Sequence, residues 1–161
     1  MTIAVLALGP ITARAANTPT PTDPYSAVDQ MRAAFSHLES VQLVEKFPNG
    51  AVATVQLMPN QGTRVSQTSV SKDRLLLDYA TQPGGDVTAD IHDFTITPLG
   101  RKSLYGNSVD GYRLIDQTGA VETLWINTHH LPVALQINAY GESVDVLYGD
   151  YNNPAIFAAK P

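Results

Sequence analysis

The sequence of 161 residues contains no cysteine. This absence excludes disulfide bonds, thiolate catalysis, Cys-ligated zinc and iron–sulfur clusters. The cysteine that carries the lipid anchor of exported bacterial lipoproteins is also missing, so an exported form of this chain is expected to be soluble.

Charged residues are scarce, at 16% of the sequence, whereas 43% of the residues are apolar. The net charge is −5 and the pI is about 5.1. This composition favours a folded core over disorder, and the length suits one domain. Lys and Arg are not concentrated in any stretch, so nucleic acid and anionic membrane surfaces are poor partners.

Long hydrophobic runs are absent too. The apolar run at residues 3–11 is far shorter than the roughly 20 residues of a transmembrane helix, so no membrane span is predicted. Ala13-Arg14-Ala15-Ala16 offers a small-residue cleavage site, which predicts a signal peptide over residues 1–15 and a periplasmic or secreted location. No Lys or Arg precedes the run, although a signal peptide normally begins with such residues. Two alternatives therefore remain: a signal peptide truncated at its start, or a disordered apolar leader. Residues 16–23 are a Pro/Thr-rich linker, and residues 24–161 form the predicted domain.

One amphipathic helix is predicted after this linker. Asp23 is a typical N-cap, and Pro24 stands at the first helical position, where its missing N–H costs nothing. Apolar residues then recur at spacings of three and four, which places them on one helix face. These residues are Val28, Met31, Phe35 and Leu38.

The apolar pattern alternates beyond Ser40, as expected for strands. Turn signals such as Pro48-Asn49-Gly50 separate the alternating runs, and successive hairpins without helices between them predict an antiparallel meander. Residues 74–79 and 87–92 are predicted as short strands, and Gly100 as a turn.

A single helix offers too little cover for the apolar face of so many strands. We therefore expect the sheet to curl upon itself as a half-barrel or to leave a hydrophobic groove. Alternation leaves open whether Trp125 packs in the core or lines such a cavity. The candidate lining residues are Met31, Phe35, Val55, Leu57, Leu75, Leu77, Leu114, Trp125, Leu135, Ile137 and Val146.

Catalytic and metal-binding motifs are weak in this sequence. Ser108 stands between glycines, but not in the spacing of a nucleophile elbow. His129 and His130 are predicted in an exposed turn, and His92 with its neighbouring aspartates lacks the spacing of a metal loop. We therefore predict no enzyme activity, no metal site and no cofactor.

Two motifs stand out in the C-terminal third. The first is Trp125-Ile126-Asn127-Thr128 followed by Leu131-Pro132-Val133, and the second is the segment 148–154, of sequence YGDYNNP. Both resemble motifs of the LolA-like periplasmic lipoprotein carriers. Similar patterns occur in mycobacterial lipoproteins related to LprG. The resemblance implies a mainly β (α+β) fold, in which a strongly bent antiparallel sheet carries the N-terminal helix on its concave face.

The same resemblance implies an apolar cavity that accepts the acyl chains of a lipid or an acylated protein. Lid helices are not legible between residues 79 and 112, and the family's lid-controlling arginine cannot be placed on Arg64, Arg74, Arg101 or Arg113. The alternative function is a non-catalytic interaction module with a filled core, whose partner is another protein of the cell envelope.

Overall fold

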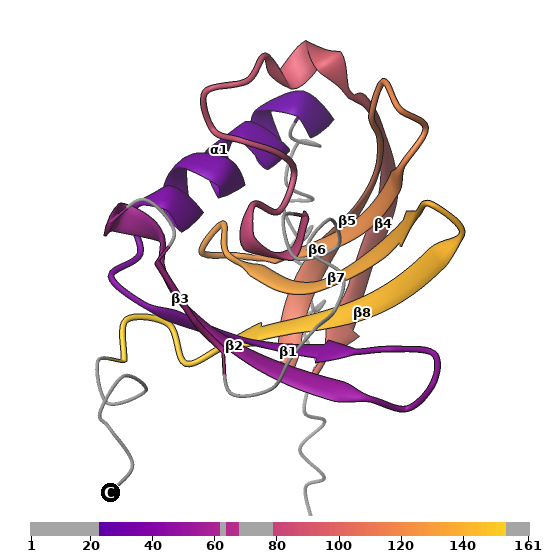
Figure 1. Ribbon diagram of the computed structural model, residues 1–161. Helices are drawn as coiled ribbons and strands as arrows, with labels where there is room; N and C mark the ends of the chain where they lie inside the picture. The colour runs from indigo at the N-terminus through magenta and orange to yellow at the C-terminus, as the bar shows by residue number, and fades with distance from the viewer. Residues whose placement is uncertain (1–22, 62–63, 68–78, 154–161) are drawn as a thin grey trace, which may run out of the picture.

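A computed structural model describes residues 23–61, 64–67 and 79–153, and it confirms the mainly β fold with a bent antiparallel sheet (Figure 1). The sheet has eight strands in the order β3-β2-β1-β8-β7-β6-β5-β4, and every pair is antiparallel. The elements are α1 (Pro24–Ser36), β1 (Val41–Lys46), β2 (Val52–Met58), η1 (Pro59–Gln61), β3 (Arg64–Gln67), η2 (Ile91–Asp93), β4 (Thr95–Leu104), β5 (Asn107–Ile115), β6 (Val121–Asn127), β7 (Pro132–Ala139) and β8 (Glu142–Gly149).

Helix α1 begins where its local sequence predicts. The side chain of Asp23 accepts a hydrogen bond of 3.0 Å from the Ser26 N–H, and Pro24 occupies the first turn. This bond satisfies one of the N–H groups that a helix start leaves without a partner. The helix ends after Ser36, and its buried face includes Val28, Met31 and Phe35.

The sheet curves around this buried face, so that α1 lies on the concave side (Figure 1). Strand alternation divides each strand between the two faces. In β6, Leu124 and Ile126 are buried toward the helix, whereas Thr123 and Trp125 are only half-buried on the convex side. The predicted half-barrel with a helix on its concave face is therefore confirmed.

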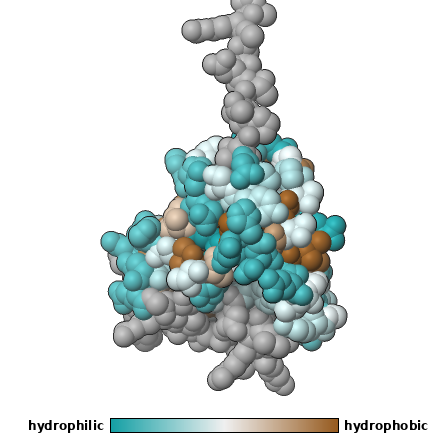
Figure 2. All heavy atoms as spheres, turned by 90° about the horizontal axis from the view of Figure 1, so that it is seen from above, coloured by the Kyte–Doolittle hydropathy of each residue, from teal (hydrophilic) through white to brown (hydrophobic). Residues whose placement is uncertain are grey.

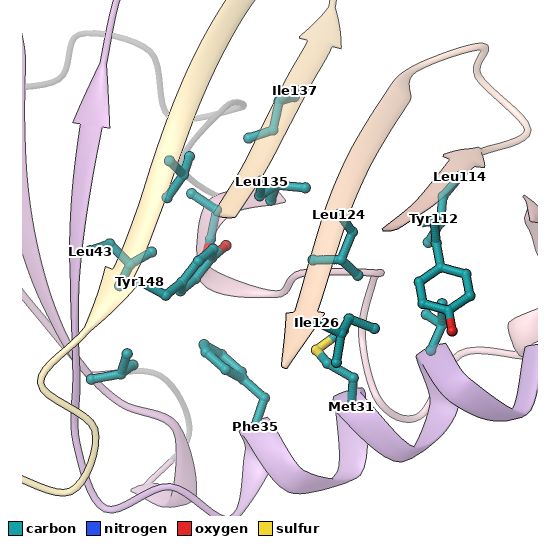
Figure 3. Packing of buried hydrophobic residues seen from close by; sticks show 14 of the residues in the cluster. Met31, Phe35, Leu43, Tyr112, Leu114, Leu124, Ile126, Leu135, Ile137 and Tyr148 are labelled. Atoms are coloured by element: carbon teal, nitrogen blue, oxygen red, sulfur yellow. The ribbon is translucent and has the colours of Figure 1, made fainter. Parts of the chain in front are cut away.

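The core is one cluster between α1 and the concave face (Figure 3). Met31 and Phe35 point from the helix toward side chains of the strands. The rings of Phe35 and Tyr148 meet edge to face, with centroids 5.9 Å apart. Because complete burial of a large apolar side chain contributes about 1.5–3 kcal/mol, this cluster is the main source of stability.

The segment 79–94 covers part of the concave side beside α1 (Figure 1). The Tyr148 hydroxyl donates a 2.7 Å hydrogen bond to the Ala80 carbonyl. The predicted strand at 87–92 is wrong, because this stretch is a loop that ends in η2. The Asp90 side chain accepts from the His92 N–H at 2.9 Å, and such local bonds compete with strand pairing. Most of the other predicted strand, at 74–79, lies outside the described residues.

Strand β4 forms one edge of the sheet. The turn predicted at Gly100 is wrong, because β4 runs from Thr95 to Leu104 with a bulge between Pro98 and Gly100. Proline lacks an N–H and is therefore tolerated at such an edge.

Strand β8 lies between β1 and β7, so the first and last strands of the described sheet are neighbours. Asn152 reinforces this junction, because its N–H donates to the Ser40 carbonyl at 2.7 Å and its side chain accepts from the Glu39 N–H at 2.9 Å.

Candidate functional site on the concave face

Most of the predicted lining residues lie together on the concave face. They come from α1, β2, β5, β7 and β8, belong to the same hydrophobic cluster and are at most 5% exposed. They pack together in one cluster between α1 and the sheet, part of which is shown in Figure 3. These residues are Met31, Phe35, Val55, Leu57, Leu114, Leu135, Ile137 and Val146.

Trp125 is the exception, because it lies on the convex face and cannot line a concave cavity. Its ring covers Gly111 on the neighbouring strand, where a Cβ atom would lie 2.2 Å from Trp125 Cζ3. The Lys102 Nζ atom lies 3.4 Å from the ring centroid on this face. Leu75 and Leu77 lie outside the described residues.

An opening of about 840 Å³ adjoins the apolar cluster at the end of the sheet where three turns meet. The turns connect β1 to β2, β5 to β6 and β7 to β8 (Figure 1). Ala120 and Ala139 line the opening and also belong to the cluster, and Phe47 packs against it. Small-molecule sites have volumes of about 300–1,000 Å³, so this opening is large enough for a ligand. The remaining lining residues are Pro48, Asn49, Thr118, Gly119, Val121, Asn138, Tyr140, Gly141, Glu142 and Ser143.

Two carboxyl groups are buried on strands that border this interior. Glu122 on β6 and Glu45 on β1 are each 2% exposed. The Gly84 N–H donates a 3.0 Å hydrogen bond to Glu122 Oε2, whereas Glu122 Oε1 and Glu45 Oε2 have no hydrogen-bond partner among the described residues. Burial raises the pKa of Glu122 to about 7 and also raises the pKa of Glu45.

Sequence reasoning missed both carboxyl groups, although a signal was present. Glu45 follows Leu43 by two residues, and Glu122 precedes Leu124 by two residues and Ile126 by four. A carboxylate within an alternating apolar set is predicted to share its buried face.

Arg32 is a third buried charge that sequence reasoning missed, and it joins α1 to the segment 79–94. Its Nη2 atom donates to the Asp86 carbonyl and, at 2.8 Å, to the Ala89 carbonyl. With the Glu122–Gly84 contact, these bonds fix the segment against the helix and the sheet.

Figure 2 shows hydrophilic residues over most of the surface seen from above, with hydrophobic residues in small separate areas.

The residues considered for metal binding are used in local structure instead. Asp86 Oδ1 accepts from the Thr88 N–H and hydroxyl at 2.8 Å each, and His92 stacks beside Tyr25 with ring centroids 5.1 Å apart. Within the described ranges, no group of three or more His, Asp or Glu side chains is placed to hold a metal ion. No helix in these ranges is long and apolar enough to span a membrane.

Comparisons with known proteins place the fold. The chain matches no family model and no curated protein sequence. Among solved structures, it resembles the Mycobacterium tuberculosis lipoprotein LppX with a TM-score of 0.58 and 13% identity, over 81% of this chain and 95% of LppX. It resembles LprF from Mycobacterium bovis with a TM-score of 0.51 and 14% identity, over 81% of this chain and 93% of LprF.

A third similar structure is the Pseudomonas aeruginosa MucA/MucB complex. The TM-score is 0.51 at 12% identity, over 81% of this chain and 56% of the matched chain. At these identities the comparisons concern the fold alone. The resemblance in fold to mycobacterial lipoproteins, which the C-terminal motifs indicated, is confirmed at that level.

Proposed function

We propose that this protein is an exported, non-catalytic carrier that binds the acyl chains of a lipid or of an acylated protein on the concave side of its half-barrel. The observation that carries the proposal is the opening of about 840 Å³, whose lining includes Ala120 and Ala139 of the hydrophobic core and Phe47, which packs against that core. Its periplasmic or secreted location follows from the signal-like segment at residues 1–15. The C-terminal motifs, which resemble those of the LolA-like lipoprotein carriers, and the similarity in fold to the lipoprotein LppX support the same proposal.

The tightness of the described core sets a condition on this function. Met31, Leu57, Leu114 and Ile137 are fully buried by the protein's own side chains. An acyl chain must therefore bind first at the opening, where Phe47 and Tyr140 line the wall. Deeper entry requires the segment 79–94 to move away from Glu122, and this motion breaks the Gly84 contact together with the hydrogen bonds that Tyr148 and Arg32 donate to the segment.

Native mass spectrometry of gently purified protein and titration with a fluorescent fatty acid test the proposal. Tyr140→Asp places a charge in the wall of the opening and should weaken fatty-acid binding about tenfold. Tyr105→Asp is the matched control, since both tyrosines are exposed turn residues with positive φ, at 54° and 51°. A clean apo mass together with no fatty-acid uptake would refute the proposal, and equal weakening by both variants would refute the assigned opening.

A second candidate function is an interaction module of the cell envelope. The close packing of the described concave side chains favours it. Its partner would be another envelope protein, bound by the sheet edge or the convex face. Capture of such a partner by a protein that takes up no fatty acid would favour this function over the carrier.

A further inference from the structure

The segment 79–94 inserts the tip of a turn into the concave side of the half-barrel. Pro83 and Gly84 form this tip, and both are buried. A Cβ atom at Gly84 would lie 3.0 Å from Val28 Cγ1 and 3.3 Å from Met31 Cε. One side of the tip therefore packs against α1, and its other side meets the sheet.

Glu122 is the sheet residue that holds this tip. Its Oε2 atom accepts the 3.0 Å hydrogen bond from the Gly84 N–H. Glu122 follows Ala120 by two residues, and it pairs with Ile137, which precedes Ala139 by two. Because Ala120 and Ala139 line the opening at the turns, the tip meets the sheet at the boundary between this opening and the core.

The environment of the Glu122 carboxyl group favours its protonated form. Oε1 is buried and has no hydrogen-bond partner among the described residues. The residues that pair with Glu122, Leu114 on β5 and Ile137 on β7, are apolar. With a proton the group is neutral and can remain buried, whereas the carboxylate is a buried charge with one hydrogen bond, which is unfavourable. Departure of the tip lets water reach that charge.

The titratable groups on the elements packed around the tip do not offset this cost. Burial raises the pKa of Glu122 to about 7, and the charge of Asp116 contributes to the rise. Burial also raises the pKa of Glu45 and of Tyr148. Arg32, the cation among these groups, donates to carbonyls of the segment 79–94 instead. The groups are Arg32 on α1, Glu45 on β1, Tyr79 in the segment, Asp116 before β6 and Tyr148 on β8.

We propose that Pro83 and Gly84 form a plug between the opening and the concave interior, and that loss of the proton from Glu122 releases this plug. Release breaks the Gly84 contact and hydrates the carboxylate. It thereby favours the wider movement of the segment 79–94 that deeper entry of an acyl chain requires. The role of the plug in acyl-chain entry rests on the function proposed above, whereas its release by Glu122 is a property of the chain itself.

Native-state amide exchange of the full chain, corrected for the intrinsic rate at each pH, tests the release. The protection of the Gly84 N–H should fall about 50-fold from pH 5 to pH 8, because the pKa of Glu122 returns from about 7 toward 4.5 when the plug opens. Glu122→Gln should remove this fall, and Glu39→Gln, which changes an exposed glutamate, should keep it. Gly84 should also be at least about tenfold less protected than Leu124 on the central strand β6. Equal protection of the two amides, or an unchanged fall in Glu122→Gln, would overturn the release.

Calorimetry with decanol tests the role of the plug in acyl-chain entry. Decanol has no titratable group, so any pH dependence of its binding comes from the protein. It should bind about fivefold to tenfold more tightly at pH 8 than at pH 6, and equally at both pH values to Glu122→Gln. Equal binding to the wild-type protein at both pH values would show that the chain stays outside the plug, and would overturn this role. Absence of decanol binding would refute the proposed function, and amide exchange would still decide the release of the plug.

Discussion

The free energy of unfolding of this protein should depend on pH through Glu122, and replacing Glu122 by glutamine is expected to remove that dependence. The carboxyl group is 2% exposed, and its burial raises its pKa from 4.5 to about 7. Because the pKa of Glu122 is higher in the folded state, the folded protein binds more protons than the unfolded protein between pH 4.5 and about pH 7. Stability from this group is therefore fully present below pH 4.5 and is lost as the pH rises through about 7.

The magnitude follows from the two pKa values. A tenfold change in proton affinity corresponds to about 1.4 kcal/mol, so the rise amounts to about 3 kcal/mol in total. Between pH 5 and pH 8 the wild-type protein should lose about 2–3 kcal/mol more unfolding free energy than Glu122→Gln. The two proteins should have similar stability at pH 5, because glutamine retains an oxygen that can accept from the Gly84 N–H.

Urea denaturation at a series of pH values provides the measurement. Fluorescence of Trp125 can follow unfolding, since it is the only tryptophan in the sequence. Glu45 also has a raised pKa, but it is present in both proteins and cancels in their difference. Glu142→Gln, which changes an exposed glutamate, is the control and should keep the wild-type pH dependence. Equal pH dependence of the wild-type protein and Glu122→Gln would refute the assignment to Glu122.

Three further substitutions test the packing, each by urea denaturation. Met31→Ala should cost about 2–5 kcal/mol, since Met31 is fully buried between helix and sheet; a cost below about 1 kcal/mol would show that the site collapses. Asp23→Ala removes the bond to the Ser26 N–H and should cost about 1 kcal/mol, whereas an unchanged midpoint would contradict the cap. Gly111→Ala should displace the Trp125 ring, alter its fluorescence and cost about 1–3 kcal/mol; an unaltered emission spectrum would contradict that contact.

Local signals were sufficient for α1 and for the alternation of most strands. Asp23 and Pro24 define the helix start through contacts within four residues. The turns at residues 48–50 and 140–141 likewise contain a glycine, Gly50 or Gly141, that adopts a positive φ. The concave candidates could therefore be selected by alternation alone, without knowledge of which strands are neighbours.

The errors arise where distant residues decide the structure. Trp125 and Leu124 present apolar groups on both faces of β6, and the absence of a side chain at Gly111 on the next strand leaves room for the indole. The sequence of segment 79–94 has no apolar periodicity. Its position depends instead on hydrogen bonds with Glu122 and Arg32. Such contacts leave no periodic trace in the sequence.

The position of β8 between β1 and β7 has a consequence for how the chain folds. Gln42 pairs with Gly149, so strands at opposite ends of the domain must meet before the sheet is continuous. Pairing across such a sequence separation requires the closure of a long loop and slows folding. A chain that lacks β8 would hold two separate meanders, β1–β3 and β4–β7, in which β1 and β7 become exposed edges prone to aggregation.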